Sequence, residues 1–273
     1  MSPNAHRELP EFDKYIFSPR RHDVALVIPV INEGERIRSQ LGRIHAHGSA
    51  VDVIVADGGS TDGSLDHDFL RAVGVRALLV KRGRGKVGAQ LRMAYSVALD
   101  EGYSGIVTMD GNGKDGVEAI DLFLAKLREG YDYVQGSRYV AGGKAINTPL
   151  ERKMAGKLIH APVLSLAGRR RYTDTTNGFR AYSRRYLEDP RVNPFRAIFD
   201  RYQLLFYLTV RAGQLGFRAT EVPVTRAYPL NEPPPSKIGG FRGKAEHLLE
   251  VLEVALGRYH PKPQEVDVQS SVG

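Results

Sequence analysis

VALVIPVINE, residues 24–33, begins as an apolar run and ends in two polar side chains. The run from Val24 to Ile28 is short and rich in β-branched residues, and Pro29 interrupts it. Those features predict a buried strand rather than a helix. Apolar residues with helical spacing follow over residues 32–47, so the stretch predicts a strand that leads directly into a helix.

The same alternation continues along the chain. We predict further strands over residues 51–56, 75–80, 105–109, 131–135 and 219–224. We predict further helices over residues 65–73, 86–101, 117–128, 150–166, 194–215 and 241–256. Strands that alternate with helices favour an α/β fold, with a mostly parallel central sheet and helices on both faces.

The boundaries of the alternating region divide the chain into three parts. Residues 1–22 are polar and contain several prolines, which predicts an N-terminal arm. Residues 23–240 form one large domain that carries the site. Residues 241–273 are predicted to be a C-terminal amphipathic helix with a polar tail.

Composition excludes several classes of protein. The chain has 273 residues, 42% of them hydrophobic, and no cysteine. It is therefore large enough for a full core, while disulfides, thiolate metal sites and cysteine nucleophiles are excluded. No stretch is apolar for long enough to span a membrane, and the N-terminus has no apolar signal core. We therefore expect a cytoplasmic protein, with room for a peripheral contact at the inner face of the membrane.

Positive charge is concentrated in one part of the chain. The net charge is +8, and residues 138–201 contain 14 basic and 5 acidic residues. A local excess of this size favours an anionic partner, such as a phosphorylated small molecule, a membrane surface or a nucleic acid. Within this region residues 150–166 are amphipathic and basic, which is compatible with a membrane interface or with ordinary core packing.

Polar residues gather where three of the predicted strands end. Asn32 and Glu33 follow the first strand, Asp57 ends the second, and 110–112 (Asp-Gly-Asn) follow a fourth. The carboxyl ends of parallel strands meet at one edge of a sheet, where ligands bind. Carboxylates in one cleft favour a hard cation, Mg²⁺ or Mn²⁺, that is shared with substrate phosphates. Asp57 is also suited to accept hydrogen bonds from a nucleobase, and any one of these acids alone can cap a helix.

A glycine-rich loop suggests a different function. Residues 83–88 read GRGKVG, follow a predicted strand and open a helix, and Asp110 lies 22 residues after Gly88. This is the pattern of a dinucleotide-binding loop. It makes an NAD-dependent oxidoreductase the alternative function. Lys86 within it is a candidate phosphate neighbour. However, the loop follows the third strand rather than the first, which weighs against that reading.

An ordered set of motifs resembles a known family. The motifs are VIPVINE (27–33), VADGGSTDG (55–63), MDGN (109–112), QGSRY (135–139), DTTNGFR (174–180), EVPV (221–224) and SK (236–237). Together they resemble glycosyltransferase family 2, and within it the branch similar to dolichol-phosphate mannosyltransferases. The resemblance implies a nucleotide-diphospho-sugar transferase fold of the GT-A type and sugar transfer with inversion.

The resemblance also implies roles for individual residues. Arg138 would face the phosphates or the acceptor, and Asp174 would serve as base or orienting group, so these two are the candidate catalytic residues. Asp110 and Asn112 would hold Mg²⁺ or Mn²⁺. The candidate nucleotide-sugar site, which includes Lys86 of the glycine-rich loop, comprises Pro29, Asn32, Glu33, Asp57, Lys86, Asp110, Gly111, Asn112, Arg226, Ser236 and Lys237.

Two positions depart from the family pattern. The usual second aspartate of the metal motif is Asn112, and Lys114 stands where relatives often have an uncharged polar residue. The metal site would therefore carry one negative charge fewer.

We expect the chain to transfer a sugar from a UDP- or GDP-linked donor to a polyprenyl phosphate or another anionic acceptor, or to a hydroxyl group. A phosphate acceptor suits the basic segment, because it is already ionised and needs positive charge rather than a base. Besides the oxidoreductase, a non-catalytic nucleotide-sugar-binding protein stays open. Nucleic acid is not the expected partner, and the sequence leaves the oligomeric state open.

Overall fold

The computed structural model describes residues 7–229 and 240–262. Its main sheet consists of β1 (Phe12–Ile16), β2 (Val24–Val30), β3 (Asp52–Asp57), β4 (Val75–Lys81), β5 (Gly105–Thr108), β6 (Tyr133–Ser137), β8 (Arg180–Ser183) and β9 (Ala219–Pro223). Two short parallel strands, β7 (Lys144–Ile146) and β10 (Thr225–Ala227), form a second sheet.

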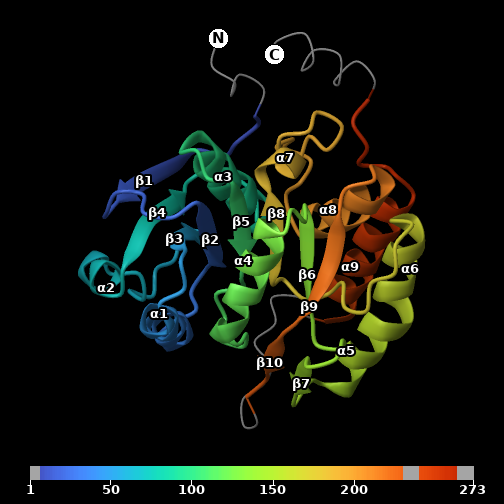
Figure 1. Cartoon of the computed structure of the whole chain (residues 1–273), viewed down its shortest axis with the longest axis horizontal. Helices are drawn as coiled ribbons and strands as arrows, with labels where there is room; N and C mark the ends of the chain where they lie inside the picture. Colours follow the sequence, from blue (N-terminus) through green and yellow to red (C-terminus); the bar gives the residue numbers. More distant parts are fainter. Residues whose placement is uncertain (1–6, 230–239, 263–273) are drawn as a thin grey trace.

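The described helices are α1 (Glu35–His47), α2 (His67–Ala72), α3 (Val87–Asp100), α4 (Ile120–Arg128), α5 (Leu150–Ala155), α6 (Ala161–Ala167), α7 (Arg184–Leu187), α8 (Gln203–Gln214) and α9 (Gly240–Ala255). A 3₁₀ turn, η1 (Val117–Ala119), precedes α4, and a π turn, η2 (Gly156–His160), joins α5 to α6. Figure 1 shows α6 and α9 together at one end of the molecule, where they pack against each other.

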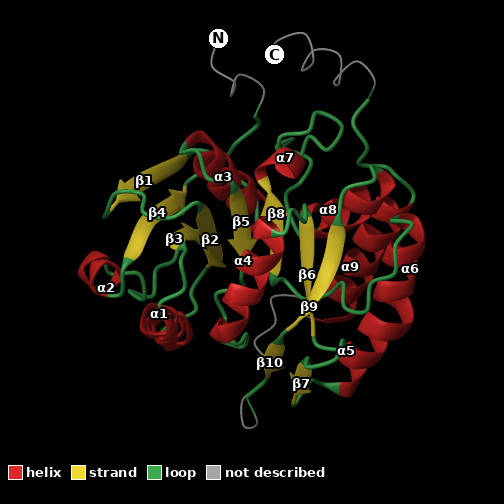
Figure 2. Ribbon diagram, viewed as in Figure 1, coloured by secondary structure: helices red, strands yellow, loops and turns green. Residues whose placement is uncertain are grey.

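The order of strands in the main sheet is β1-β4-β3-β2-β5-β8-β6-β9. Six of these strands run in one direction, while β1 and β8 run antiparallel to their neighbours. Helices cover the sheet on both sides (Figure 2). The predicted mostly parallel α/β fold is therefore confirmed.

Alternation along β2 supplies both halves of the core. Ala25 and Val27 face the cluster that contains α3 and α8, whereas Leu26 and Ile28 face the cluster that contains α1 and α4. Successive side chains of a strand point to opposite faces, so a continuous apolar run is required wherever both faces are covered. The apolar run at residues 24–28 is thus explained by burial on both sides.

The sequence prediction missed β8, which lies between β5 and β6. Its first residue, Arg180, is 1% exposed. A charged residue is not expected in a buried strand, so the sequence did not indicate a strand here. The guanidinium donates to the carbonyl oxygens of Asn177 and Thr175 and to the Thr209 hydroxyl. A buried charge is tolerated when all its donors are used in this way.

Two other predicted segments differ from the structure. The helix predicted over residues 194–215 begins only at Gln203, and residues 194–202 form no α-helix or strand. The predicted arm contains β1, whose backbone pairs with β4 from Phe12 to Ile16. In both segments long-range packing decides the conformation rather than local propensity.

Candidate active site

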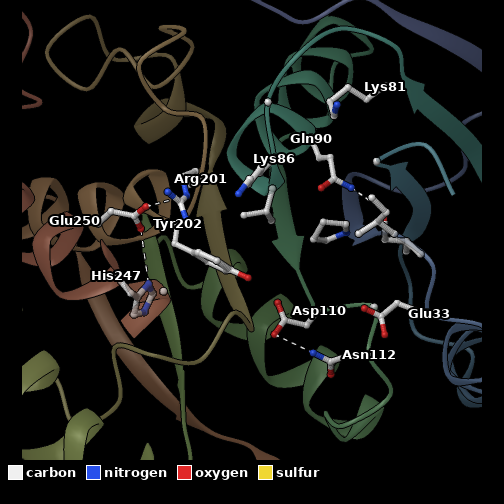
Figure 3. A pocket seen from close by; sticks show the side chains of 18 of the residues that line it. Glu33, Lys81, Lys86, Gln90, Asp110, Asn112, Arg201, Tyr202, His247 and Glu250 are labelled. Atoms are coloured by element: carbon white, nitrogen blue, oxygen red, sulfur yellow. Dashed lines mark hydrogen bonds and ion pairs between the residues drawn. The ribbon is translucent and has the colours of Figure 1, made fainter. Parts of the chain in front are cut away.

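A cleft of about 680 Å³ opens at the carboxyl ends of β2 and β5. The amino end of α3 forms one wall, and residues of α8's amino end and of α9 form the opposite wall (Figure 3). It is lined by Pro29, Val30, Ile31, Glu33, Arg36, Gly58, Lys81, Gly85, Lys86, Val87, Gln90, Asp110, Gly111, Asn112, Arg201, Tyr202, Gly243, Glu246, His247 and Glu250. This is the edge of the sheet at which the sequence places the site.

Six of the predicted site residues line this cleft: Pro29, Glu33, Lys86, Asp110, Gly111 and Asn112. The turn after β5 can lie against β2 only because residue 111 is a glycine. A Cβ at Gly111 would stand 2.9 Å from the carbonyl oxygen of Pro29 and 2.8 Å from a methyl group of Val30. Glu33 forms an ion pair with Arg36, at 3.3 Å, one turn along the chain.

Asp57 and Asn32 lie beside the cleft and organise its floor. Asp57 is 3% exposed, and its carboxylate accepts hydrogen bonds from the backbone N–H and the hydroxyl of Ser60. Asn32, in a left-handed conformation with φ of 49°, accepts from the N–H of Thr61. Asp57 thus orders the turn after β3, and Asn32 joins the turn after β2 to it. Their predicted contact with the nucleotide stays a prediction.

Arg226 and Lys114 bring positive charge to Asp110. Arg226 is 6% exposed, and it donates to Asp110 at 2.9 Å and also pairs with Asp115. Burial lowers the pKa of Arg226, but the Asp115 and Asp110 carboxylates outweigh it and hold that pKa well above its usual range. Lys114 is also buried, and burial together with Arg226 lowers its pKa. The charge of Asp110 is therefore offset by the protein itself.

The turn that carries Asp110 offers a small donor set for a divalent cation. Only Asp110 contributes a carboxylate, and Asn112 contributes an amide oxygen that also accepts from the N–H of Lys114 at 3.3 Å. Across residues 7–229 and 240–262, no group of three histidine or acidic side chains suits a metal ion. Such a pair fits Mg²⁺ or Mn²⁺ only if the substrate phosphates and water complete the shell, as is common for Mg²⁺.

Arg138 and Asp174 form a buried ion pair outside the cleft lining. The guanidinium donates to both carboxylate oxygens, at 2.7 and 2.9 Å, and the N–H of Arg138 adds a third bond at 3.1 Å. Arg138 also donates to Thr176. Burial lowers the pKa of Arg138, but Asp174 outweighs that effect and raises it. An aspartate held on both oxygens is poorly placed to accept a substrate proton, so the geometry favours the orienting role.

Four cations surround a single buried tyrosine and form what we call the cation cluster: Lys114, Arg138, Arg152 and Arg226. Lys114, Arg152 and Arg226 lie 4.7, 5.7 and 6.0 Å from the ring centroid of Tyr228. Burial raises the pKa of Tyr228, but Arg226, Arg152, Lys114 and Arg138 outweigh it and lower that pKa. Three carboxylates, Asp110, Asp115 and Asp174, pair with cations of this cluster, so a small excess of positive charge remains beside Asp110, and it is suited to an anion.

The glycine-rich loop is explained by packing. The N–H groups of Lys86 and Gly88, which a phosphate would need, both donate to the carbonyl oxygen of Asp200. A Cβ at Gly88 would stand 2.5 Å from the carbonyl oxygen of Phe199. The loop therefore packs against residues 199–201, and these two N–H groups are not available to a phosphate. The oxidoreductase interpretation was wrong.

The sequence did not identify the wall contributed by α8 and α9. Arg201 forms ion pairs with Glu246 at 2.8 Å and with Glu250 at 3.3 Å. These ion pairs hold α9 over the cleft. Tyr202 points toward Asp110 from the opposite side (Figure 3). Burial raises the pKa of Tyr202 to about 12, with a further rise from Asp110, so its hydroxyl stays a donor at neutral pH.

Further residues of the cleft also escaped the sequence prediction. Gln90 of α3 donates to the carbonyl oxygens of Val30 and Ala56, so it fixes the ends of two strands. Its position on an otherwise apolar helix face is the one sequence signal that was available. No local sequence signal marked Lys81, Arg36 or His247 as residues of the cleft. Ser236 and Lys237, predicted to close over the diphosphate, lie outside the described residues.

Comparison with known proteins identifies relatives for most of the chain. The family model "Glycosyl transferase family 2" matches residues 25–190. A polyprenol monophosphomannose synthase of Mycolicibacterium smegmatis is 32% identical over 203 residues, which cover 73% of this chain and 76% of that protein. An undecaprenyl-phosphate mannosyltransferase of Micrococcus luteus is 34% identical over 213 residues, which cover 74% and 82%.

Solved structures support the fold. Glucosyl-3-phosphoglycerate synthase from Mycobacterium tuberculosis, crystallised with Mn²⁺, UDP and phosphoglyceric acid, has a TM-score of 0.59. It is 18% identical, and the match covers 96% of this chain and 82% of that one. At this identity the likeness concerns the fold, which is the predicted GT-A architecture.

Proposed function

The chain belongs to glycosyl transferase family 2 and is a glycosyltransferase, and from that premise we propose that it moves a sugar from a nucleoside diphosphate to a polyprenyl phosphate, with inversion. The observation that carries the proposal is the cation cluster beside Asp110. A cluster of fixed cations suits a phosphate acceptor, whereas a hydroxyl acceptor needs a free base. The names of both mannosyltransferase relatives support the same class of acceptor.

We assign the donor to the cleft. Pro29, Glu33 and Asp57 would hold the nucleoside, either uracil or guanine, at the ends of β2 and β3. Its diphosphate would lie between Lys86 and Asp110, which both line the cleft. Tyr202 would donate its hydroxyl to an oxygen of the diphosphate or of the sugar.

Asp110 and Asn112 would hold Mg²⁺ or Mn²⁺, with the substrate phosphates as the other ligands. A divalent cation, when bound, supplies positive charge to the leaving group. Arg226 and Lys114 supply positive charge at the same place from the protein. Fixed charge of this kind stabilises the negative charge that develops on the leaving oxygen.

The acceptor phosphate would bind at Arg138 and Arg152. One of its oxygens attacks the anomeric carbon while the bond from that carbon to the β-phosphate oxygen breaks, and a nucleoside diphosphate leaves on the opposite face. The phosphate oxygen is already ionised, so no proton has to be removed. Asp174 then has a positioning role: it holds Arg138 with both oxygens and keeps the guanidinium aimed.

The direct test is transfer of radiolabelled sugar from UDP- and GDP-sugars to undecaprenyl phosphate, with the product extracted into organic solvent. We expect one donor to give a lipid-linked product whose anomeric configuration is inverted by NMR. Retention of configuration would contradict the mechanism. Failure of every nucleotide sugar with every phosphate acceptor, in a protein that binds nucleotides, would overturn the proposal in favour of a binding protein.

The predicted location stays a prediction: cytoplasmic, with peripheral contact at the inner face of the membrane. Among the residues that the structure describes, no helix has both the length and the apolar character to cross a bilayer. A polyprenyl phosphate acceptor nevertheless requires the active site to reach a lipid surface.

A further inference from the structure

The helix formed by α5, η2 and α6 presents apolar side chains to solvent. Leu150, Met154, Leu158 and Leu166 are 72%, 49%, 65% and 84% exposed, and Pro162 between the last two is also exposed. These five residues, which we call the apolar ridge, recur at every fourth position. A surface helix normally turns its apolar stripe to the core and its polar face to water. Exposed apolar surface of this kind marks an interaction site.

The π turn keeps the ridge on one side of the helix. On a regular α-helix a four-residue spacing drifts around the axis by about 40° per step. The wider turn at Gly156–His160 has more residues per turn and removes part of that drift. The opposite face, with Gly156, His160 and Leu164, is buried against the protein. The ridge therefore faces outward along the whole helix.

Basic residues accompany the ridge. Lys153 and Lys157 are exposed on the same helix, and Arg169, Arg170 and Arg171 are exposed directly after its end. Each Lys or Arg near an anionic lipid surface strengthens binding to it by electrostatic attraction. Apolar side chains between cations are the pattern of a helix that lies in a membrane interface, with its apolar face at the boundary between headgroups and acyl chains.

The other side of the same helix borders the cation cluster. A Cβ at Gly156 would stand 3.5 Å from the hydroxyl oxygen of Thr176, which accepts from Arg138. Arg152 lies over the ring of Tyr228 at 5.7 Å, and Lys157 over that of Tyr139 at 4.2 Å. A helix is about 10–12 Å across. The ridge and the proposed acceptor site are thus separated by one helix.

We propose that the apolar ridge docks on the surface of a bilayer that contains anionic lipids, and that this docking places the cation cluster at headgroup depth. A lipid phosphate then reaches Arg138 and Arg152 while its hydrocarbon chain stays in the bilayer. The placement of the acceptor rests on the proposed function, whereas the docking itself does not.

The docking is tested by co-sedimentation of the full chain with vesicles of phosphatidylcholine, with and without phosphatidylglycerol. We expect binding that is stronger with phosphatidylglycerol. Leu158→Glu and Leu166→Glu should each weaken binding to both kinds of vesicle by about tenfold or more, because a buried leucine contributes roughly 1.5–3 kcal/mol. Lys153→Gln combined with Arg170→Gln should weaken only the binding that depends on phosphatidylglycerol.

Leu122→Glu is the matched control, because Leu122 is 41% exposed but lies on α4, outside the ridge. It should bind vesicles as the unchanged protein does. Absence of vesicle binding in the unchanged chain would overturn the proposal. So would a result in which Leu158→Glu leaves vesicle binding intact but converts a dimer to a monomer on gel filtration, since the ridge would then be a contact between two copies.

A soluble acceptor separates the docking from the proposed function. With geranyl phosphate in free solution, Leu158→Glu should turn over as fast as the unchanged protein. With undecaprenyl phosphate in vesicles it should be slower by at least about tenfold, in line with the lost binding. Equal losses on both acceptors would overturn the docking role of the ridge. If no acceptor is used by the unchanged chain, the proposed function fails, while vesicle binding still decides the docking.

Discussion

The two sides of the active site are built in different ways. On the donor side Asp57 and Glu33 are each held by a partner three residues along the chain, Ser60 and Arg36. On the acceptor side the charges are fixed by partners far along the chain: Arg138 pairs with Asp174, 36 residues away, and Arg226 with Asp115, 111 residues away. The donor side should therefore tolerate substitution without loss of stability, whereas the acceptor side combines binding with structure.

Asp110→Ala should have the largest effect on catalysis and a small effect on stability. Loss of this carboxylate removes the one charged ligand proposed for the divalent cation and an ion-pair partner that positions Arg226, and we expect the two losses together to lower kcat by about 10³-fold. Arg226 keeps Asp115 as a partner, so the free energy of unfolding should change by less than about 1 kcal/mol. Steady-state rates and urea unfolding measure the two effects. Asp121→Ala, at an exposed position of α4, is the control, and full activity of Asp110→Ala would contradict the assignment.

Asp174→Asn should lower both activity and stability, which is the signature of the acceptor side. Breaking a buried ion pair costs about 3–5 kcal/mol, and the misaligned Arg138 should raise the KM for the acceptor and reduce turnover by about 10²-fold. Donor affinity, measured by calorimetry, should stay the same.

The exposed ion pair of Asp68 with Arg71 provides the matched comparison, because Asp68→Asn should cost less than about 1 kcal/mol. If Asp174→Asn removed the acidic limb of the pH–rate profile, Asp174 would be a general base, and the positioning role would be wrong. Unchanged turnover would exclude Asp174 from the site.

Removal of divalent metal tests how much charge the protein supplies itself. Because Arg226 and Lys114 lie beside Asp110, we expect a chelator to lower turnover by only about tenfold. In Lys114→Gln the same treatment should lower it further, since one fixed cation is then missing. Turnover at several concentrations of Mg²⁺ and Mn²⁺ gives the comparison. Complete loss of activity in the chelated unchanged protein would mean that these cations do not substitute for metal.

The smallest expected effect is on the free energy of unfolding at acidic pH. It comes from His160 in η2, beside the proposed acceptor site. Burial, together with His247, lowers the pKa of His160 from 6.5 to about 4. The unfolded chain therefore binds more protons between these values, and stability falls as the pH falls through 6.5 toward 4. Between pH 7 and 5.5 we expect a loss of roughly 1 kcal/mol from this group.

His160→Phe should remove that part of the pH dependence in urea unfolding curves recorded at several pH values. His45→Phe, at an exposed position in the last turn of α1, should leave the curve unchanged. An unaltered pH dependence in His160→Phe would show that other groups cause the acid sensitivity.

Local sequence was sufficient for the donor side. Apolar runs of the right length predicted β2 to β6 and β9, and the parallel arrangement then required Glu33 and Asp110 to meet at one edge. Both residues do line the cleft. On the acceptor side the family resemblance predicted Arg138 and Asp174 as site residues, and the excess of positive charge over residues 138–201 predicted an anionic partner. No local pattern encodes which carboxylate each arginine contacts.

The sequence by itself determined the strand–helix alternation, the family and the edge of the sheet that carries the site. Those properties depend on hydrophobic periodicity and on short motifs, both of which act over a few residues. Only the tertiary structure decided that Asp174 is held by Arg138, that α9 covers the cleft through Arg201, and that the apolar ridge faces water. Each of these depends on packing between segments that lie tens of residues apart, and local propensity carries no information about such contacts.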